Sequence, residues 1–112
     1  MDTTDFEAME RNGWADPSIA KTYADTFSNA TRLVARHLAE DVGARQGAHV
    51  LDLCCGHGVV SAELVTRGAE VTGLDFSPAM VSLAEVAVPE AMFVQGDAMA
   101  MAFADASFDA VT

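Results

Sequence analysis

Basic side chains are scarce in this sequence of 112 residues. Six Lys and Arg face seventeen Asp and Glu, which gives a formal net charge of -11 at pH 7. Such a charge repels the phosphates of nucleic acids and the anionic surface of a membrane. The sequence therefore argues against nucleic-acid binding through a basic surface. After Arg67 the chain has seven acidic residues and no Lys or Arg, so a ligand bound there is expected to present cationic or hydroxyl groups.

Long apolar runs and separated cysteines are also missing. The longest apolar run, residues 98–104, has seven residues, whereas a membrane-spanning helix needs about 20. The acidic N-terminus lacks the basic start of a signal peptide. Cys54 and Cys55 are adjacent and would point to opposite faces of a strand, which excludes an ordinary disulfide framework. These absences predict a cytoplasmic protein, without membrane insertion, in a reducing compartment.

The remaining composition is that of one small folded domain. With 51% hydrophobic and 21% charged residues, the chain is too apolar to be disordered. Residues 1–15 are acidic and weakly patterned, so we expect a mobile leader there. Ordered structure is expected to begin at Asp16, which can cap a helix whose first turn contains Pro17, and residues 16–112 form the predicted domain. Apolar residues from Ile19 to Leu38, spaced three or four apart, predict one face of a long helix.

Strands and helices alternate after this long helix. Four short segments predict β-strands, at residues 48–53, 70–74, 91–95 and from 107 onward. Two segments between them predict helices, at residues 59–66 and 78–86. This order predicts an α/β fold of Rossmann type, in which helices cover both faces of a parallel sheet. Because the last strand is cut short, we expect a sheet that is incomplete at the C-terminus and belongs to a longer protein or to a homodimer formed through the free sheet edge.

The turn after the first predicted strand carries the most chemical information. Gly56 and Gly58 lie between that strand and a helix, where residues without side chains allow a tight turn and the close approach of a ligand. This pattern predicts a nucleotide-like cofactor at the carboxyl ends of the strands. Asp52 precedes the turn, where its charge would oppose the pyrophosphate of a dinucleotide. A carboxylate there suits a positively charged cofactor such as S-adenosylmethionine.

Two more carboxylates follow the next two predicted strands. Asp75 lies 23 residues after Asp52, close to the spacing at which an acid accepts both ribose hydroxyls of a nucleotide. Asp97 lies a further 22 residues on, where a carboxylate can accept a hydrogen bond from an adenine amino group. Three acids on one rim predict an adenosyl cofactor, although Asp75 alone also fits a dinucleotide.

Three stretches, VLDLCCGHG, VTGLDFSPAMVSLA and FVQGDAMAMAFADASFDAVT, resemble in order and spacing the motifs of class I S-adenosylmethionine-dependent methyltransferases. The resemblance covers residues 19–112 and is greatest to small-molecule enzymes of the ubiquinone and menaquinone biosynthesis type. It implies the strand order 3-2-1-4, S-adenosylmethionine as cofactor, S-adenosylhomocysteine as product and a small molecule as methyl acceptor. Nothing in the sequence identifies the acceptor or its nucleophilic atom.

The resemblance also implies which residues bind the cofactor. They are Tyr23, Asp52, Cys54, Gly56, Gly58, Asp75, Phe76, Asp97 and Ala98. It implies that Asp75 holds the ribose and that Phe76 packs on the adenine. Asp97 would meet the adenine amino group, and the backbone N–H of Ala98 would face the ring. The others would shape the pocket for the methionine and sulfonium end, with Tyr23 lying over it.

Some of these positions depart from the pattern or have a second interpretation. Cys54 stands where the family usually has Gly, and His57 where Thr, Ser or Asn is more frequent. His57 either reaches the cofactor carboxylate or points into solvent, and we favour solvent. Tyr23 also lies on the apolar stripe of the long helix, where it can simply fill the core, and Asp109 is expected to orient the fourth strand. A metal site of Cys54, Cys55 and His57 is not expected, because the chain has no second cysteine pair.

The sequence therefore predicts the cofactor-binding part of a methyltransferase. Displacement at an already activated sulfonium carbon can rest on placing the acceptor in line, so no catalytic side chain is assigned. Two alternatives stay open at this point. The first is an oxidoreductase domain that binds an NAD-type dinucleotide and tolerates Asp52 beside the pyrophosphate. The second is a module that binds S-adenosylmethionine without catalysing a reaction.

Overall fold

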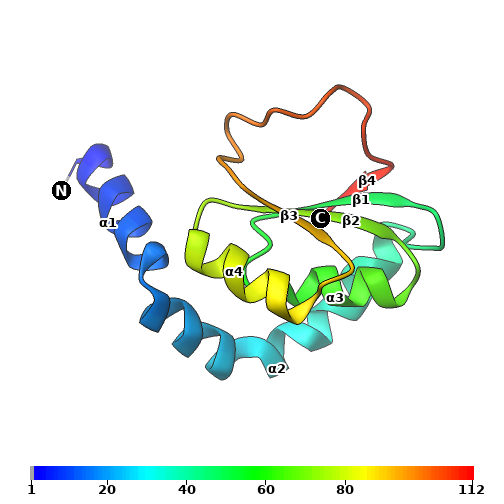
Figure 1. Ribbon diagram of the computed structural model, residues 1–112, viewed down its shortest axis with the longest axis horizontal. Coiled ribbons are helices and arrows are strands. Elements are labelled where there is room, and N and C mark those ends of the chain that lie inside the picture. Colours follow the sequence, from blue (N-terminus) through cyan, green and yellow to red (C-terminus); the bar gives the residue numbers. More distant parts are fainter. Residues whose placement is uncertain (1) are drawn as a thin grey trace.

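A parallel β-sheet with helices against it organises the chain, and the computed structural model shown in Figure 1 describes residues 2–112. The helices of these residues are α1 (Thr3–Ala15), α2 (Pro17–Asp41), α3 (Val59–Thr66) and α4 (Pro78–Ala87). The strands are β1 (His49–Leu53), β2 (Glu70–Asp75), β3 (Met92–Gln95) and β4 (Ala110–Val111). All neighbouring strands are parallel, in the order β3-β2-β1-β4. The predicted α/β fold and the strand order 3-2-1-4 are confirmed.

Capping residues set the starts of the two best-predicted helices. The Asp16 side chain accepts a hydrogen bond from the Ser18 N–H at 2.8 Å, and Pro17 occupies the first turn of α2. The Ser77 hydroxyl accepts one from the Met80 N–H at 3.2 Å at the start of α4. Each cap satisfies an N–H group that has no partner within its helix. Both helices therefore begin at the predicted residues.

The prediction that ordered structure begins at Asp16 is wrong, because residues Thr3–Ala15 form α1. The Asp2 side chain caps this helix by accepting a hydrogen bond from the Asp5 N–H at 2.9 Å. None of the residues of α1 is buried. Local interactions, namely the Asp2 cap and the ion pair of Arg11 with Glu7, stabilise the helix. It has no buried apolar stripe, so hydrophobic periodicity did not indicate it. The mobility expected for residues 1–15 stays a prediction, and Met1 lies outside the described residues.

Helices α2, α3 and α4 lie together on one face of the sheet, as Figure 1 shows. The prediction of helices on both faces is therefore wrong for residues 2–112. The reason is topological: β1, β2 and β3 advance in one direction across the sheet, so right-handed crossovers place α3 and α4 on the same face. The chain then reverses direction from β3 to β4. It crosses the opposite face as residues 96–109, a segment without a helix.

The hydrophobic core lies between the sheet and helices α2 and α3. Its buried members are Ala39, Ala48, Val50, Leu64, Ala69 and Val71. Val50 on β1 and Val71 on β2 are register partners, so their side chains share the helix-facing side of the sheet. Leu64 of α3 has no exposed surface and fills the space above them. Among the helices of residues 2–112, none combines the length and the apolar character that crossing a membrane requires.

Candidate functional site

Two adjoining cavities open at the carboxyl ends of β1, β2 and β3, and we call them together the strand-end pocket. The smaller, of about 230 Å³, is lined by Trp14, Tyr23, Cys54, Gly56, Asp75, Phe76 and Met80. The larger, of about 480 Å³, is lined by α1 residues together with Cys54, Leu74, Phe76, Gly96, Asp97, Ala98 and Met99. The two share Cys54 and Phe76. Of the predicted site residues, all except Asp52 and Gly58 line this pocket.

Asp75 connects the glycine turn to the start of α4. It is the last residue of β2 and is only 7% exposed. Its Oδ2 accepts a hydrogen bond from the Gly56 N–H, and its Oδ1 accepts one from the Ser77 N–H, both at 2.9 Å. A carboxylate offers about four lone-pair sites. The Asp75 side chain can therefore hold the turn and still accept hydrogen bonds from a ligand's hydroxyl groups.

Helix α1 covers the larger cavity, an arrangement that the sequence pattern did not predict. The Arg11 Nη2 lies 3.4 Å from the Asp97 Oδ2, and the Asp97 Oδ1 accepts a hydrogen bond from the Met99 N–H at 2.8 Å. The Arg11 guanidinium carbon also lies 5.9 Å from the centroid of the Phe76 ring, within cation–π distance. Trp14, which follows on the same helix, lines the smaller cavity. The sequence offered one indication that this segment lines a site, namely Arg11 and Trp14 in an otherwise acidic stretch.

Cys54 has a left-handed backbone conformation, with a φ of 52°. A side chain is unfavourable in this region, which explains why glycine is usual at this position of the motif that the sequence resembles. The thiol lines both cavities. Burial and the nearby carboxylates of Asp75 and Asp52 raise the pKa of Cys54, which disfavours the thiolate.

Replacing Cys54 with glycine is expected to raise the free energy of unfolding by about 1 kcal/mol, because it removes the cost of a left-handed L-residue. Urea unfolding followed by circular dichroism measures this change. The control is Cys54→Ala, which removes the thiol but keeps a Cβ and should give no such gain. An equal gain in both variants would show that backbone strain is not the cause.

Asp52 does not line the strand-end pocket, so the prediction that three carboxylates share one rim is wrong for this residue. Its side chain is 4% exposed and accepts hydrogen bonds from the Ser61 Oγ at 2.7 Å and the Thr112 Oγ1 at 3.1 Å. The physical reason is strand alternation: position 52 shares the helix-facing side of β1 with Val50. Burial raises the pKa of Asp52, against the opposing effect of the Ser61 hydrogen bond.

Gly58 and His57 also lie elsewhere than predicted. Gly58 precedes α3 with a φ of 94°, and a Cβ there would come within 3.3 Å of the Val88 Cγ2. It therefore allows α3 to approach the end of α4 closely. His57 neither reaches the strand-end pocket nor points freely into solvent, because it is half-buried and its Nε2 lies 2.9 Å from the Ser28 Oγ of α2.

Tyr23 is half-buried and lies between other aromatic rings and the smaller cavity. Its ring packs edge-on against Trp14 at a centroid distance of 5.2 Å and against His57 at 6.0 Å, and it also lines the smaller cavity. Asp109 accepts a hydrogen bond from the His49 N–H at 2.8 Å, which confirms that it orients the start of β4 beside β1. Within residues 2–112, no group of three or more His, Cys, Asp or Glu side chains is arranged to hold a metal ion.

The fold and the strand-end pocket define a Rossmann-like domain with a pocket at the carboxyl ends of its parallel strands. Its acidic strand end and aromatic wall meet at the carboxyl edge of a parallel sheet, where such domains bind cofactors. The comparison with known families is consistent with this class. The family described as "Methyltransferase domain" matches residues 50–112, which is more than half of the chain. The chain belongs to this methyltransferase family.

Individual relatives agree with the family. The chain is 47% identical over 81 residues to a demethylmenaquinone methyltransferase of Beutenbergia cavernae. The matched region covers 72% of this chain and 34% of that protein. The chain is 41% identical over 96 residues to the sterol 24-C-methyltransferase ERG6B of Gibberella zeae, covering 80% of this chain and 25% of that protein. The chain thus spans about a third or less of the length of these relatives.

A solved structure shares the fold over most of the chain. The TehB-like SAM-dependent methyltransferase of Corynebacterium glutamicum superposes with a TM-score of 0.70 and 28% sequence identity, covering 86% of this chain and 54% of that one. The predicted resemblance to S-adenosylmethionine-dependent methyltransferases is confirmed. These similarities favour a methyltransferase over the alternative of an oxidoreductase domain that binds a dinucleotide.

Proposed function

We propose that this chain is the cofactor-binding part of an S-adenosylmethionine-dependent methyltransferase that acts on a small molecule. The observation that carries the proposal is the strand-end pocket, in which the buried Asp75 and the Phe76 ring adjoin the glycine turn. Membership of the methyltransferase family supports it. Because the chain spans only part of its relatives, the activity of the whole protein is part of the proposal.

The residues present fit this cofactor. Phe76, Ala98 and Met99 give the larger cavity an apolar wall suited to an adenine ring. No Lys or Arg lines the smaller cavity, so that cavity offers no cationic side chain to a pyrophosphate. At Gly56, a Cβ would meet nothing within 4 Å, so the turn borders open space in which a ligand can lie close to the backbone. A cationic, phosphate-free adenosyl compound matches these features better than a dinucleotide does.

Each lining residue then has a specific task. Asp75 accepts the ribose hydroxyls, Phe76 packs on the adenine, and Asp97 and the Ala98 N–H bind the edge of that ring. Tyr23, Cys54 and Gly56 border the methionine and sulfonium end. When bound, S-adenosylmethionine supplies a methyl group activated by the adjacent sulfonium, and S-adenosylhomocysteine is the product. The protein's own contribution is to bind, orient and exclude water.

Asp52 and Gly58 act indirectly in this proposal. Asp52 bonds Ser61 of α3 and Thr112 beside β1, which fixes the strand and the helix on either side of the glycine turn. Gly58 permits the close contact of α3 with Val88. Both residues therefore position the glycine turn through contacts with α3 and the end of α4, and need not contact the cofactor.

The acceptor class is proposed only as a small molecule. The relatives named above act on different acceptors by their names, a demethylmenaquinone in one case and a sterol in the other. A cytoplasmic location and a homodimer formed through the sheet edge are further parts of the proposal. Cell fractionation and analytical ultracentrifugation test these two points.

Ligand-dependent thermal unfolding tests the cofactor. S-adenosylhomocysteine at a hundred times its Kd should stabilise the protein by about 2.7 kcal/mol, because it binds only the folded state. NAD at the same concentration is the control and should leave the Tm nearly unchanged. A larger shift with NAD would overturn the assignment. Methyl transfer by the longest available version of the protein, measured against a panel of small acceptors, separates an enzyme from a non-catalytic module.

A further inference from the structure

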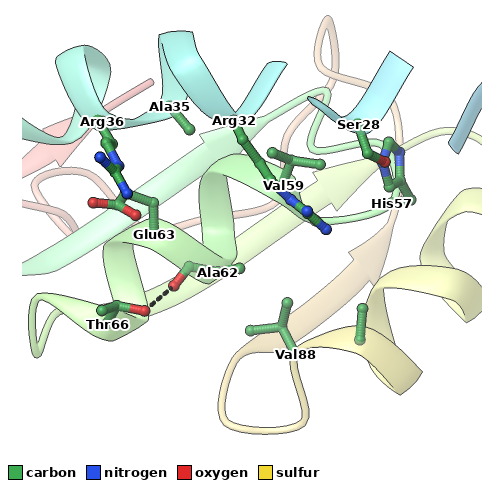
Figure 2. Close-up of a pocket in the computed structure, with 12 residues that line it drawn as sticks. Ser28, Arg32, Ala35, Arg36, His57, Val59, Ala62, Glu63, Thr66 and Val88 are labelled. Carbon is green, nitrogen blue, oxygen red and sulfur yellow. Dashed lines mark hydrogen bonds between the residues drawn. The ribbon is translucent and has the colours of Figure 1, made fainter. Parts of the chain in front are cut away.

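A separate cavity of about 310 Å³ lies between α2, α3 and α4, and Figure 2 shows the side chains that line it. Its polar lining comes from Ser28, Arg32 and Arg36 on α2 and from His57, Glu63 and Thr66 in and before α3. None of its lining residues belongs to the strand-end pocket. The proposed cofactor therefore leaves this cavity without an assigned role.

The cavity concentrates positive charge in a strongly acidic protein. Of only six Lys and Arg in the chain, Arg32 and Arg36 both line it. They lie four residues apart on α2 and extend toward α3 in Figure 2, a spacing at which like charges repel. In the described part of the chain, residues 2–112, neither guanidinium forms an ion pair with a carboxylate. The one carboxylate of the lining, Glu63, pairs instead with Arg67, at an Nε to Oε1 distance of 3.0 Å.

The other polar groups of the cavity are held by local partners. The Thr66 Oγ1 donates a hydrogen bond to the Ala62 carbonyl at 2.9 Å, and the Ser28 hydroxyl lies 2.9 Å from the His57 Nε2. Burial and the charge of Arg32 lower the pKa of His57, against the opposing effect of Asp25. The guanidinium groups of Arg32 and Arg36, which form no ion pair within residues 2–112, are thus hydrogen-bond donors available to a ligand.

We propose that Arg32 and Arg36 form a binding site for a small phosphorylated ligand in this cavity. A guanidinium presents a planar fork of donors that matches the oxygens of a phosphate in a bidentate way. A bound phosphate would also relieve the repulsion between the two arginines. The volume of about 310 Å³ suits a compact phosphate ester. The net charge of -11 opposes a nucleic acid as the source of the phosphate.

A titration with inorganic phosphate at constant ionic strength tests this site. Two-dimensional NMR of the ¹⁵N-labelled protein should show saturable shifts confined to residues 28–36 of α2, His57 and Thr66. Arg32→Gln combined with Arg36→Gln should weaken binding at least tenfold. Arg45→Gln is the matched control, because it removes the same charge outside the cavity and should leave binding unchanged. Shifts that do not saturate, or that persist in the double variant, would overturn the proposal.

Further arms of the experiment define the ligand and guard against misfolding. Glycerol phosphate should bind at least as tightly as inorganic phosphate if the natural ligand is an ester, whereas equal saturation by acetate would overturn the phosphate class. Arg32→Lys with Arg36→Lys keeps both charges but removes the forks, so binding should weaken while the circular dichroism spectrum stays unchanged. Unweakened binding in this lysine variant would refute bidentate recognition, even if the glutamine variant failed to fold.

Discussion

Replacing Asp75 with asparagine is expected to weaken the binding of S-adenosylhomocysteine about ten- to a hundredfold. Hydrogen bonds to a charged group contribute about 1.5 to 3 kcal/mol each, and about 1.4 kcal/mol corresponds to a tenfold change in Kd. Asparagine keeps the shape of the side chain but replaces one acceptor oxygen with an NH₂ group. That group would face the N–H of either Gly56 or Ser77, both of which the carboxylate now holds at 2.9 Å. Isothermal titration calorimetry measures the change in Kd.

The matched control for this variant is Asp105→Asn. Asp105 is exposed on the segment between β3 and β4 and is not among the residues lining the strand-end pocket, so its replacement removes the same charge at a distance. Binding to this variant should change less than about twofold, because exposed charges are screened. Equal losses in both variants would mean that net charge governs binding, and full affinity in Asp75→Asn would refute the ribose contact.

Replacing Leu64 with alanine is expected to lower the free energy of unfolding by about 2 to 5 kcal/mol, because it leaves a cavity in the core. The Leu64 side chain is fully buried between α3 and the sheet, beside Val50 and Val71. Small domains have a total stability of only about 5 to 15 kcal/mol, so this loss is a large fraction of it. Urea unfolding monitored by circular dichroism gives the change directly.

Leu33→Ala provides the comparison for the core variant. Leu33 lies on α2 and is 71% exposed, so the same chemical change should alter stability by no more than about 0.5 kcal/mol. Similar losses in the two variants would show that helix propensity, rather than core packing, dominates. A loss below about 1 kcal/mol in Leu64→Ala would contradict the packing of α3 against the sheet.

Local patterns were enough to predict most of the helices and strands and the place of Asp75 at the end of β2. Asp16 with Pro17, and Ser77 with Pro78, marked the helix starts because an N-terminal cap depends on residues within one turn. The strands followed from short apolar runs between turn residues, and the alternation of strands with helices predicted parallel pairing. Asp75 was assigned correctly to the pocket because the last residue of a parallel strand lies at the ligand-binding edge of the sheet.

Contacts between distant parts of the chain settled the rest. Asp52 bonds Thr112, and Arg11 reaches Asp97, so neither arrangement is visible in a local pattern. The side of β1 that holds Asp52 depends on how the strand sits against α3, and the placement of α1 over the pocket depends on its packing against α2 and α4. Sequence periodicity reports which residues of one segment share a face. Periodicity does not show which segments pack against each other, because tertiary packing depends on burial and charge over the whole fold.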